Sequence, residues 1–290
     1  MIPKTTTVVA LLGLPRSGTT LVARHIGAHS RIAPLIEPYQ AQKQSDYKQT
    51  QLEQLCVDFN ISVPLAGGIL IKETATRPIN IDLTLQTLRL AAEAGYPTGI
   101  ILQLRSPIEA LYSQVEAAQV YWRGGKPVLN AQGRLQGFWH KIEAFYNIIQ
   151  SQIYRFPLRV CIFHRFLVNP RYELSRLMAF FPLELEATQF DIEVAEKKMH
   201  IDRGQSTTDR LLPSYGDPKA WDKSKPVSLN SVADRTRQVA QFRTTFGEHP
   251  LGRRMLRLHN CVTNLQNAAL FDDDEIAARF FLEFGQLSDL

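Results

Sequence analysis

The chain has 290 residues, of which 44% are hydrophobic and 21% are charged, and its formal net charge is +5 at pH 7. This length and apolar content suit one large globular domain or two small ones. The weak positive charge suits an anionic small ligand, and without a run of five like charges it gives no reason to expect nucleic acid as a partner. No stretch of 18 apolar residues occurs, so we expect neither a membrane-spanning helix nor a membrane partner.

The three cysteines, Cys56, Cys161 and Cys261, are far apart in the sequence. An odd number without a C-x-x-C pair favours small buried thiols over disulfides or a zinc site. The apolar run at the N-terminus resembles a short signal peptide, but it lacks a clean cleavage site, and we interpret it as a strand. Together with the reduced thiols, this predicts a cytoplasmic protein.

The first predicted strand covers residues 7–14 and leads into the segment Pro15-Arg16-Ser17-Gly18-Thr19-Thr20. A helical pattern begins at Thr19. A strand, a glycine-containing loop and a helix N-terminus in this order are typical of an anion site, because backbone amides and the helix dipole both attract negative charge. The segment nearly matches a nucleotide-binding P-loop, but Thr19 stands where a lysine should follow Gly18, and the cation is Arg16 instead.

Strands and helices alternate along the next part of the chain. We predict a strand at 68–73, a helix at 80–94, a strand at 98–105, a helix from Pro107, a helix at 134–153, a strand with an exit loop at 158–170 and a helix at 170–181. A long irregular segment follows over 200–226, and helical patterns resume at Val232 and again within 271–284. The alternation predicts a P-loop-type three-layer α/β/α fold with a central parallel sheet. We expect a single domain over 1–290, with 266–290 as a C-terminal helical extension.

A second polar constellation begins where the third predicted strand ends, at Arg105. This residue falls at the carboxyl edge of the sheet, where α/β proteins bind ligands. Ser113 lies two turns into the helix that follows, so the pair can form a second anion site. The predicted strand ends at Lys72, Arg105 and His164 are basic or neutral, whereas a kinase needs an acidic strand end for Mg²⁺. We therefore expect two phosphate sites and no metal.

The loop at residues 15–20, followed by Arg105 and then Ser113, resembles the sulfotransferases that use 3′-phosphoadenosine 5′-phosphosulfate (PAPS), in particular their bacterial and tyrosylprotein-like branch. The segment Phe166-Leu167-Val168-Asn169-Pro170 and the late segment 221–232 are also similar to that family, although the family's Glu is replaced here by Arg165 or Phe166. The likeness spans roughly residues 7–247. It implies a single P-loop-type sulfotransferase domain with PAPS as co-substrate, the bisphosphate nucleotide PAP as product, and no required metal.

The resemblance also implies roles for individual residues. The donor's 5′-phosphosulfate is expected to bind to the loop, and its 3′-phosphate to Arg105 and Ser113. The expected donor-binding residues are Arg16, Ser17, Gly18, Thr19, Thr20, Arg105, Ser113 and, by a weaker match, Arg203. By the same resemblance, Arg16 is expected to stabilise the leaving phosphate. Glu37 occupies the place of a catalytic Glu in tyrosylprotein and heparan-type sulfotransferases, and we predict that it is the general base. Glu73 is the second candidate base and His140 the third, and Lys72 resembles a strand-end Lys that lies near the sulfate.

The acceptor stays open at this stage. A phenol, a sugar, a peptide tyrosine or a carrier-bound alcohol all suit the chemistry, and a homodimer is possible. The alternatives to a sulfotransferase are a P-loop kinase or other phosphotransferase, and a nucleotide-binding module without turnover. The missing lysine after Gly18 weighs against the kinase.

Overall fold

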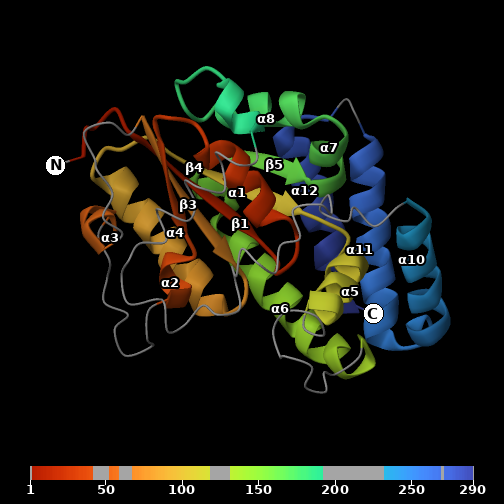
Figure 1. Cartoon of the computed structure of the whole chain (residues 1–290). Coiled ribbons are helices and arrows are strands. Elements are labelled where there is room, and N and C mark those ends of the chain that lie inside the picture. Colours follow the sequence, from red (N-terminus) through yellow and green to blue (C-terminus); the bar gives the residue numbers. More distant parts are fainter. Residues whose placement is uncertain are drawn as a thin grey trace.

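Five parallel strands form the centre of the protein, as a computed structural model shows (Figure 1). The structure describes residues 2–41, 52–58, 67–117, 131–191, 232–268 and 271–289. The strands are β1 (Thr7–Gly13), β2 (Ile32–Ile36), β3 (Gly68–Thr74), β4 (Thr98–Leu104) and β5 (Leu158–Ile162). Their order in the sheet is β2-β3-β1-β4-β5, and every neighbouring pair is parallel. The predicted parallel sheet is confirmed.

Helices connect and extend these strands. They are α1 (Thr19–Gly27), α2 (Pro38–Ala41), α3 (Leu52–Asp58), α4 (Pro78–Glu93), α5 (Pro107–Ala117), α6 (Ala131–Gln152), α7 (Phe163–Val168), α8 (Pro170–Met178), α10 (Val232–Phe246), α11 (Pro250–Asn267) and α12 (Asp273–Gly285). Several of these helices begin at a proline, whose missing N–H costs nothing at the first helical position. Among the helices in the described part of the chain, none has the length and apolar character to cross a bilayer.

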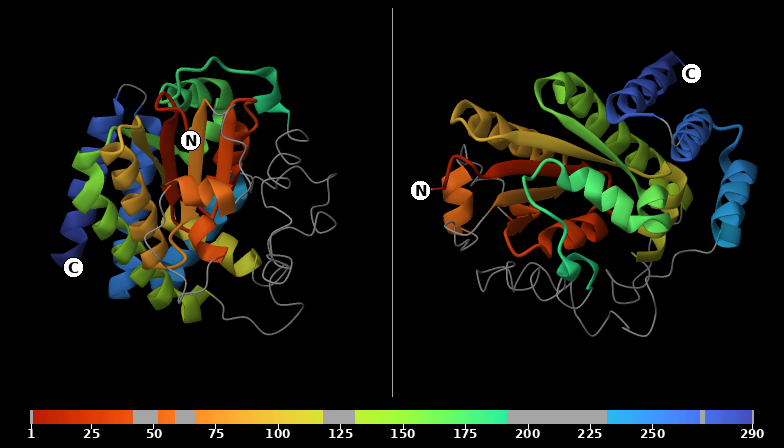
Figure 2. Two further views of the ribbon diagram at one scale, coloured as in Figure 1. Left: turned by 90° about the vertical axis from the view of Figure 1, so that its left-hand side faces the viewer. Right: turned by 90° about the horizontal axis from the view of Figure 1, so that it is seen from above.

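The side chains of β1 divide between two cores. Val8, Ala10 and Leu12 belong to a cluster with residues of α4, α6, α11 and α12, whereas Val9 and Leu11 belong to a second cluster with residues of α1 and α8. This alternation follows from the two-residue period of a strand, and the absence of exposure on both faces explains the continuous apolar run. Figure 2 shows helices on both faces of the sheet, so the predicted three-layer α/β/α architecture is confirmed.

The structure differs from the sequence prediction at two elements. The strand β2 was not expected, because Pro34 interrupts its apolar run; as an edge strand paired only with β3, it tolerates a residue that cannot donate to a ladder. The exit loop expected at the end of 158–170 is instead the helix α7, which begins directly after β5. This early turn into helix places Phe163 and His164 at the carboxyl edge of the sheet.

The helix α12 is bound to the other edge strand of the sheet. One carboxylate oxygen of Asp273 accepts a hydrogen bond from the backbone amide of Val160 in β5 at 2.7 Å, and the other accepts from Arg159 at 3.0 Å. Further along the helix, Phe280 and Phe284 pack against the ring of Tyr146 in α6, with centroids 4.7 and 5.3 Å away. The edge of β5 is thereby covered, although the predicted single domain over the whole chain stays a prediction.

Candidate functional site

The site begins in the loop that joins the central strand β1 to helix α1. Gly18 has a left-handed backbone with φ of 97°, and a Cβ atom there would lie 2.3 Å from the ring of Phe163. Only glycine fits this position, for both reasons. As the N-cap of α1, Gly18 provides no side-chain hydrogen bond, so the first amides of the helix remain available to an external acceptor.

The environment of Ser17 indicates that the loop can bind a ligand. Its side chain is buried, and its Oγ has no hydrogen-bond partner among the residues that the structure describes. The Ser17 amide donates to the carbonyl of Leu14 at 3.1 Å, so it is already occupied within the loop. A buried hydroxyl without a partner is costly, and the phosphate oxygens of a ligand can remove that cost. Thr19 is buried beside it and Thr20 is half-buried.

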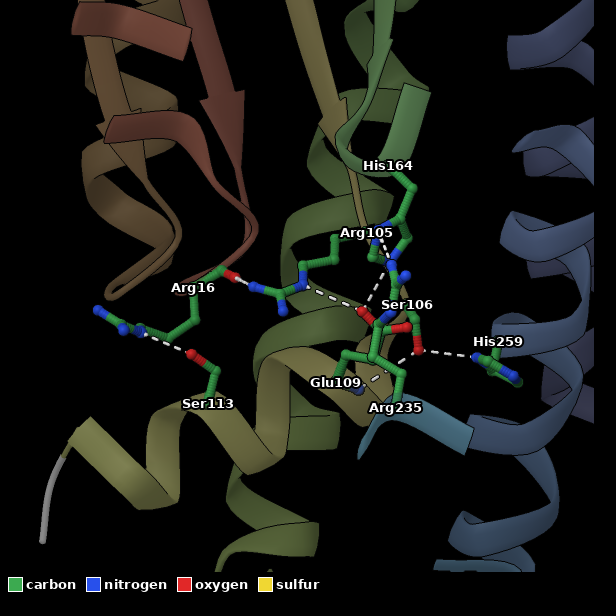
Figure 3. Close-up of polar contacts among 8 residues, drawn as sticks. All are labelled: Arg16, Arg105, Ser106, Glu109, Ser113, His164, Arg235 and His259. Atoms are coloured by element: carbon green, nitrogen blue, oxygen red, sulfur yellow. Dashed lines mark hydrogen bonds and ion pairs between the residues drawn. The ribbon is translucent and has the colours of Figure 1, made fainter. Parts of the chain in front are cut away.

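The two constellations recognised in the sequence meet at this loop (Figure 3). Arg16 Nε donates to Ser113 Oγ at 3.2 Å, and Arg105 Nη1 donates to the carbonyl oxygen of Arg16 at 2.8 Å. The meeting follows from the sheet order, since β4 lies directly beside β1 and both end at the same edge. The structure therefore brings together two cations and a hydroxyl from segments about ninety residues apart.

Glu37 lies on the other side of the loop, where β2 ends beside β3. Its carboxylate forms an ion pair with Lys72 Nζ and accepts a hydrogen bond from Thr74 Oγ1 at 2.9 Å. The register explains this contact, because Ile36 stands opposite Lys72 in the parallel pair. The Glu37 amide donates to the Lys72 carbonyl at 2.7 Å, although its backbone is left-handed with φ of 51°. Lys72 is 1% exposed, and a buried cation of this kind needs such a carboxylate beside it.

Glu73 points to the opposite face of β3 and is fully buried. Its carboxyl group accepts hydrogen bonds from the amides of Tyr39 at 3.4 Å and Thr74 at 3.3 Å. Burial raises the pKa of Glu73 to about 8, helped by the charge of Glu37 and opposed by Lys72 and the two amides. Glu73 thus links β3 to the start of α2.

Sequence reasoning missed a group of residues behind Arg105. Glu109, one helical turn away, lies 3.5 Å from Arg105 Nε, and His164 Nε2 lies 2.7 Å from the same Glu109 oxygen. Phe163 packs beneath, with the Arg105 guanidinium 4.3 Å from its ring centroid. The spacing of four residues between Arg105 and Glu109 is a recognisable signal for a helical ion pair. His164, which lies on α7, has no such local signal in the sequence.

Two of the predicted residues are not among those that meet in the described site. Arg203 lies outside the residues that the structure describes. His140 is exposed on α6, a position typical of a solvated helix surface. Within the described ranges, no group of three His, Cys, Asp or Glu side chains could hold a metal ion. Cys56 and Cys161 are free buried thiols, as expected, and Cys261 is half-buried.

The fold and the site together define an α/β protein whose β1–α1 loop, two arginines and a serine meet at the carboxyl edge of a parallel sheet. No family model matches the chain, and no curated protein does. Among solved structures, the chain is similar to the sulfotransferase domain from the curacin biosynthetic pathway, with 14% identity, a TM-score of 0.44, and coverage of 64% of this chain and 77% of that one.

Two further sulfotransferases are similar to the chain. The mouse sulfotransferase SULT7A1, crystallised with PAP, has 10% identity and a TM-score of 0.45, with coverage of 88% of this chain and 89% of that one. The sulfotransferase STF1 of Mycobacterium tuberculosis H37Rv has 13% identity and a TM-score of 0.39, with coverage of 67% and 76%. These identities and TM-scores are too low to transfer chemistry, so the function below depends on this chain's own site.

Proposed function

We propose that the protein is a sulfotransferase that moves a sulfuryl group from PAPS to a hydroxyl or amine acceptor without a metal ion. The observation that carries the proposal is the meeting of Arg16, Arg105 and Ser113 at the β1–α1 loop. A donor with an anion at each end needs two cationic positions a short distance apart. Arg16 supplies one and Arg105 the other, and each is placed by a separate motif.

The loop side takes the 5′-phosphosulfate in this proposal. The first amides of α1, the side chains of Thr19 and Thr20 and the orphaned Ser17 hydroxyl are the donors available to phosphate oxygens. The second side takes the 3′-phosphate on Arg105 and Ser113. Ser113 already accepts a hydrogen bond from Arg16, so its hydroxyl proton remains free to donate to a ligand oxygen.

Glu37, Arg16 and Lys72 supply the chemistry of the transfer. Glu37 takes the proton from the acceptor hydroxyl as the acceptor oxygen bonds to sulfur. The bond from sulfur to the bridging phosphate oxygen breaks, and its electron pair goes to the phosphate of PAP. Arg16 neutralises that developing charge. Lys72 is paired with Glu37 before the reaction and can turn to a sulfate oxygen as Glu37 gains its proton.

The range of acceptors that we propose is a small molecule, a glycan or a peptide tyrosine. We also propose that the protein acts in the cytoplasm and that it can form a homodimer. A kinase is a weaker candidate, because Thr19 replaces the lysine that reaches the β- and γ-phosphates. A binding module without turnover is also weaker, since Glu37 is held beside the loop by Lys72 and Thr74.

Thermal unfolding with two nucleotides tests the proposal. We expect 3′,5′-adenosine bisphosphate at 100 times its Kd to stabilise the chain by about 2.7 kcal/mol, and ATP-Mg at the same concentration to stabilise it much less. Stabilisation by ATP-Mg alone would overturn the assignment and favour the phosphotransferase. No stabilisation by either nucleotide would also exclude PAPS as the donor.

A further inference from the structure

A chain of four polar side chains extends from the loop into the C-terminal helices (Figure 3). Arg105 Nε faces Glu109, and Glu109 also accepts a hydrogen bond from His164 Nε2 at 2.7 Å. Arg235 Nη1 contacts both nitrogens of the His164 ring; it lies nearer to Nδ1, to which it donates, and 3.3 Å from Nε2. The chain thus crosses from α5 through α7 to α10, three elements that are widely separated in sequence.

The partners of His164 define its tautomer. A guanidinium has donors only, so Nδ1 beside Arg235 must offer its lone pair. Nε2 then carries the proton and donates it to the carboxylate of Glu109. In this tautomer the His164 ring joins Arg235 to Glu109 through its two nitrogens.

The charges explain why Glu109 is needed there. The Arg105 side chain is only 12% exposed; burial lowers its pKa, Glu109 opposes that change, and the nearby charges of Arg16 and Arg235 add to it. Burial acts to raise the pKa of Glu109 itself, but His164, Arg105 and Arg235 more than offset this and hold it below the ordinary value. Glu109 is the carboxylate that faces Arg105 and is also influenced by the charge of Arg235.

A second contact fixes the start of α5. Ser106 Oγ accepts from the amide of Glu109 at 3.3 Å and lies 2.8 Å from Nδ1 of His259 in α11. Burial lowers the pKa of His259, so its ring is neutral and Nδ1 can accept the Ser106 proton. Ser106 and His259 look like a nucleophile and its base, but the Ser106 hydroxyl is occupied on both sides as a helix cap.

We propose that Arg235, His164 and Glu109 form a positioning relay that holds the Arg105 guanidinium in the orientation that binds the donor's 3′-phosphate. This inference rests on the proposed function. None of the relay residues touches the reacting atoms; they act through Arg105, whose Nη1 they keep on the Arg16 carbonyl. The helix α10 thereby sets the selectivity of a site on the far side of β4.

The relay and a purely electrostatic role predict opposite results for one substitution. If Glu109 only competed with phosphate for Arg105, then Glu109→Gln would strengthen the binding of an anion. If Glu109 positions Arg105, the same change leaves a buried guanidinium without its carboxylate, and it must be reordered when the ligand binds. The preference for a 3′-phosphate then falls.

Two substitutions of Arg235 isolate the hydrogen bond from the charge. Arg235→Gln and Arg235→Met both remove the positive charge, but only glutamine can donate to His164 Nδ1. The readout is the ratio of the Kd for adenosine 5′-monophosphate to the Kd for 3′,5′-adenosine bisphosphate, measured by titration calorimetry on the full chain. We expect this ratio to fall about tenfold in Arg235→Met and in Glu109→Gln, and to stay within about threefold of wild type in Arg235→Gln.

The possible results of these titrations test the relay and the proposed function separately. A wild-type chain that does not prefer the bisphosphate would refute the proposed function itself. A wild-type preference with equal losses in both Arg235 variants would reduce Arg235 to a charge and overturn the relay, and so would tighter bisphosphate binding in Glu109→Gln. Unchanged binding of adenosine 5′-monophosphate in every variant confirms that the folded site is intact.

Discussion

Arg16 and Glu37 are the non-glycine residues with a left-handed backbone in the described ranges, with φ of 68° and 51°. Such a conformation costs about 1 kcal/mol or more and persists where the surroundings impose it, often at functional sites. At Arg16 the carbonyl is held by Arg105, and at Glu37 the amide is held by Lys72. The two strained residues are the ones that the sequence resemblance assigns to the leaving group and the general base.

Glu37 and Glu73 are distinguished by turnover. We expect Glu37→Gln to keep nucleotide affinity and to lose turnover by a factor on the order of 10²–10⁴, because the acceptor proton has no base. Glu73→Gln is the matched control: its amide replaces a carboxyl group whose pKa of about 8 keeps it mostly protonated at neutral pH, so turnover should persist. The measurement is PAP release from PAPS, with whichever of a simple phenol, a sugar and a tyrosine peptide wild type uses best. The reverse pattern would move the base to Glu73.

At the residue scale, the sequence could indicate where a side chain lies only where a local pattern carried the information. Gly18, Arg16 and Ser113 could be recognised because strand, loop and helix follow one another in the chain. His164 and Arg235 could not, because their meeting with Glu109 depends on how α7 and α10 pack, which no local spacing records. The same limit applies to Glu37 and Glu73, because no local spacing records that Glu73 is the more deeply buried of the two.

At the scale of elements, the edges of the sheet were the hardest part to predict. The apolar runs of β1, β3 and β4 are continuous because both faces are buried, and their bounds were anticipated closely. The strand β2 escaped notice since an edge position tolerates Pro34. The edge strand β5 was expected, but its cover by α12 through a single carboxylate was not.

Asp273 makes the attachment of α12 testable. Asp273→Asn keeps an acceptor for the Val160 amide but loses the charge shared with Arg159 and Arg176, so we expect a loss of about 2–4 kcal/mol in the free energy of unfolding. Asp274→Asn is the control, since it removes the same charge from the same helix turn at an exposed position and should cost about 0.5 kcal/mol at most. Urea denaturation measures both. Equal effects would reduce Asp273 to an interaction with the helix dipole.

At the scale of the whole molecule, the strand order determines which residues of the site lie on each side of the β1–α1 loop. Because β1 is central, its loop has β3 on one side and β4 on the other (Figure 1). The β3 side presents Glu37 and Lys72, and the β4 side presents Arg105 and Ser113. The proposed donor therefore lies with its 3′-phosphate toward β4 and its sulfate toward β3, where the acceptor meets the base.

The most direct test of this arrangement titrates two nucleotides into the wild-type chain and two variants. The account predicts that wild type binds 3′,5′-adenosine bisphosphate more tightly than adenosine 5′-monophosphate. It predicts that Arg105→Met lowers this preference by about tenfold or more, whereas Arg16→Met weakens both nucleotides and leaves the preference in place. A preference unchanged by Arg105→Met, or abolished by Arg16→Met alone, would contradict the assignment of the two cations to the two ends of PAPS.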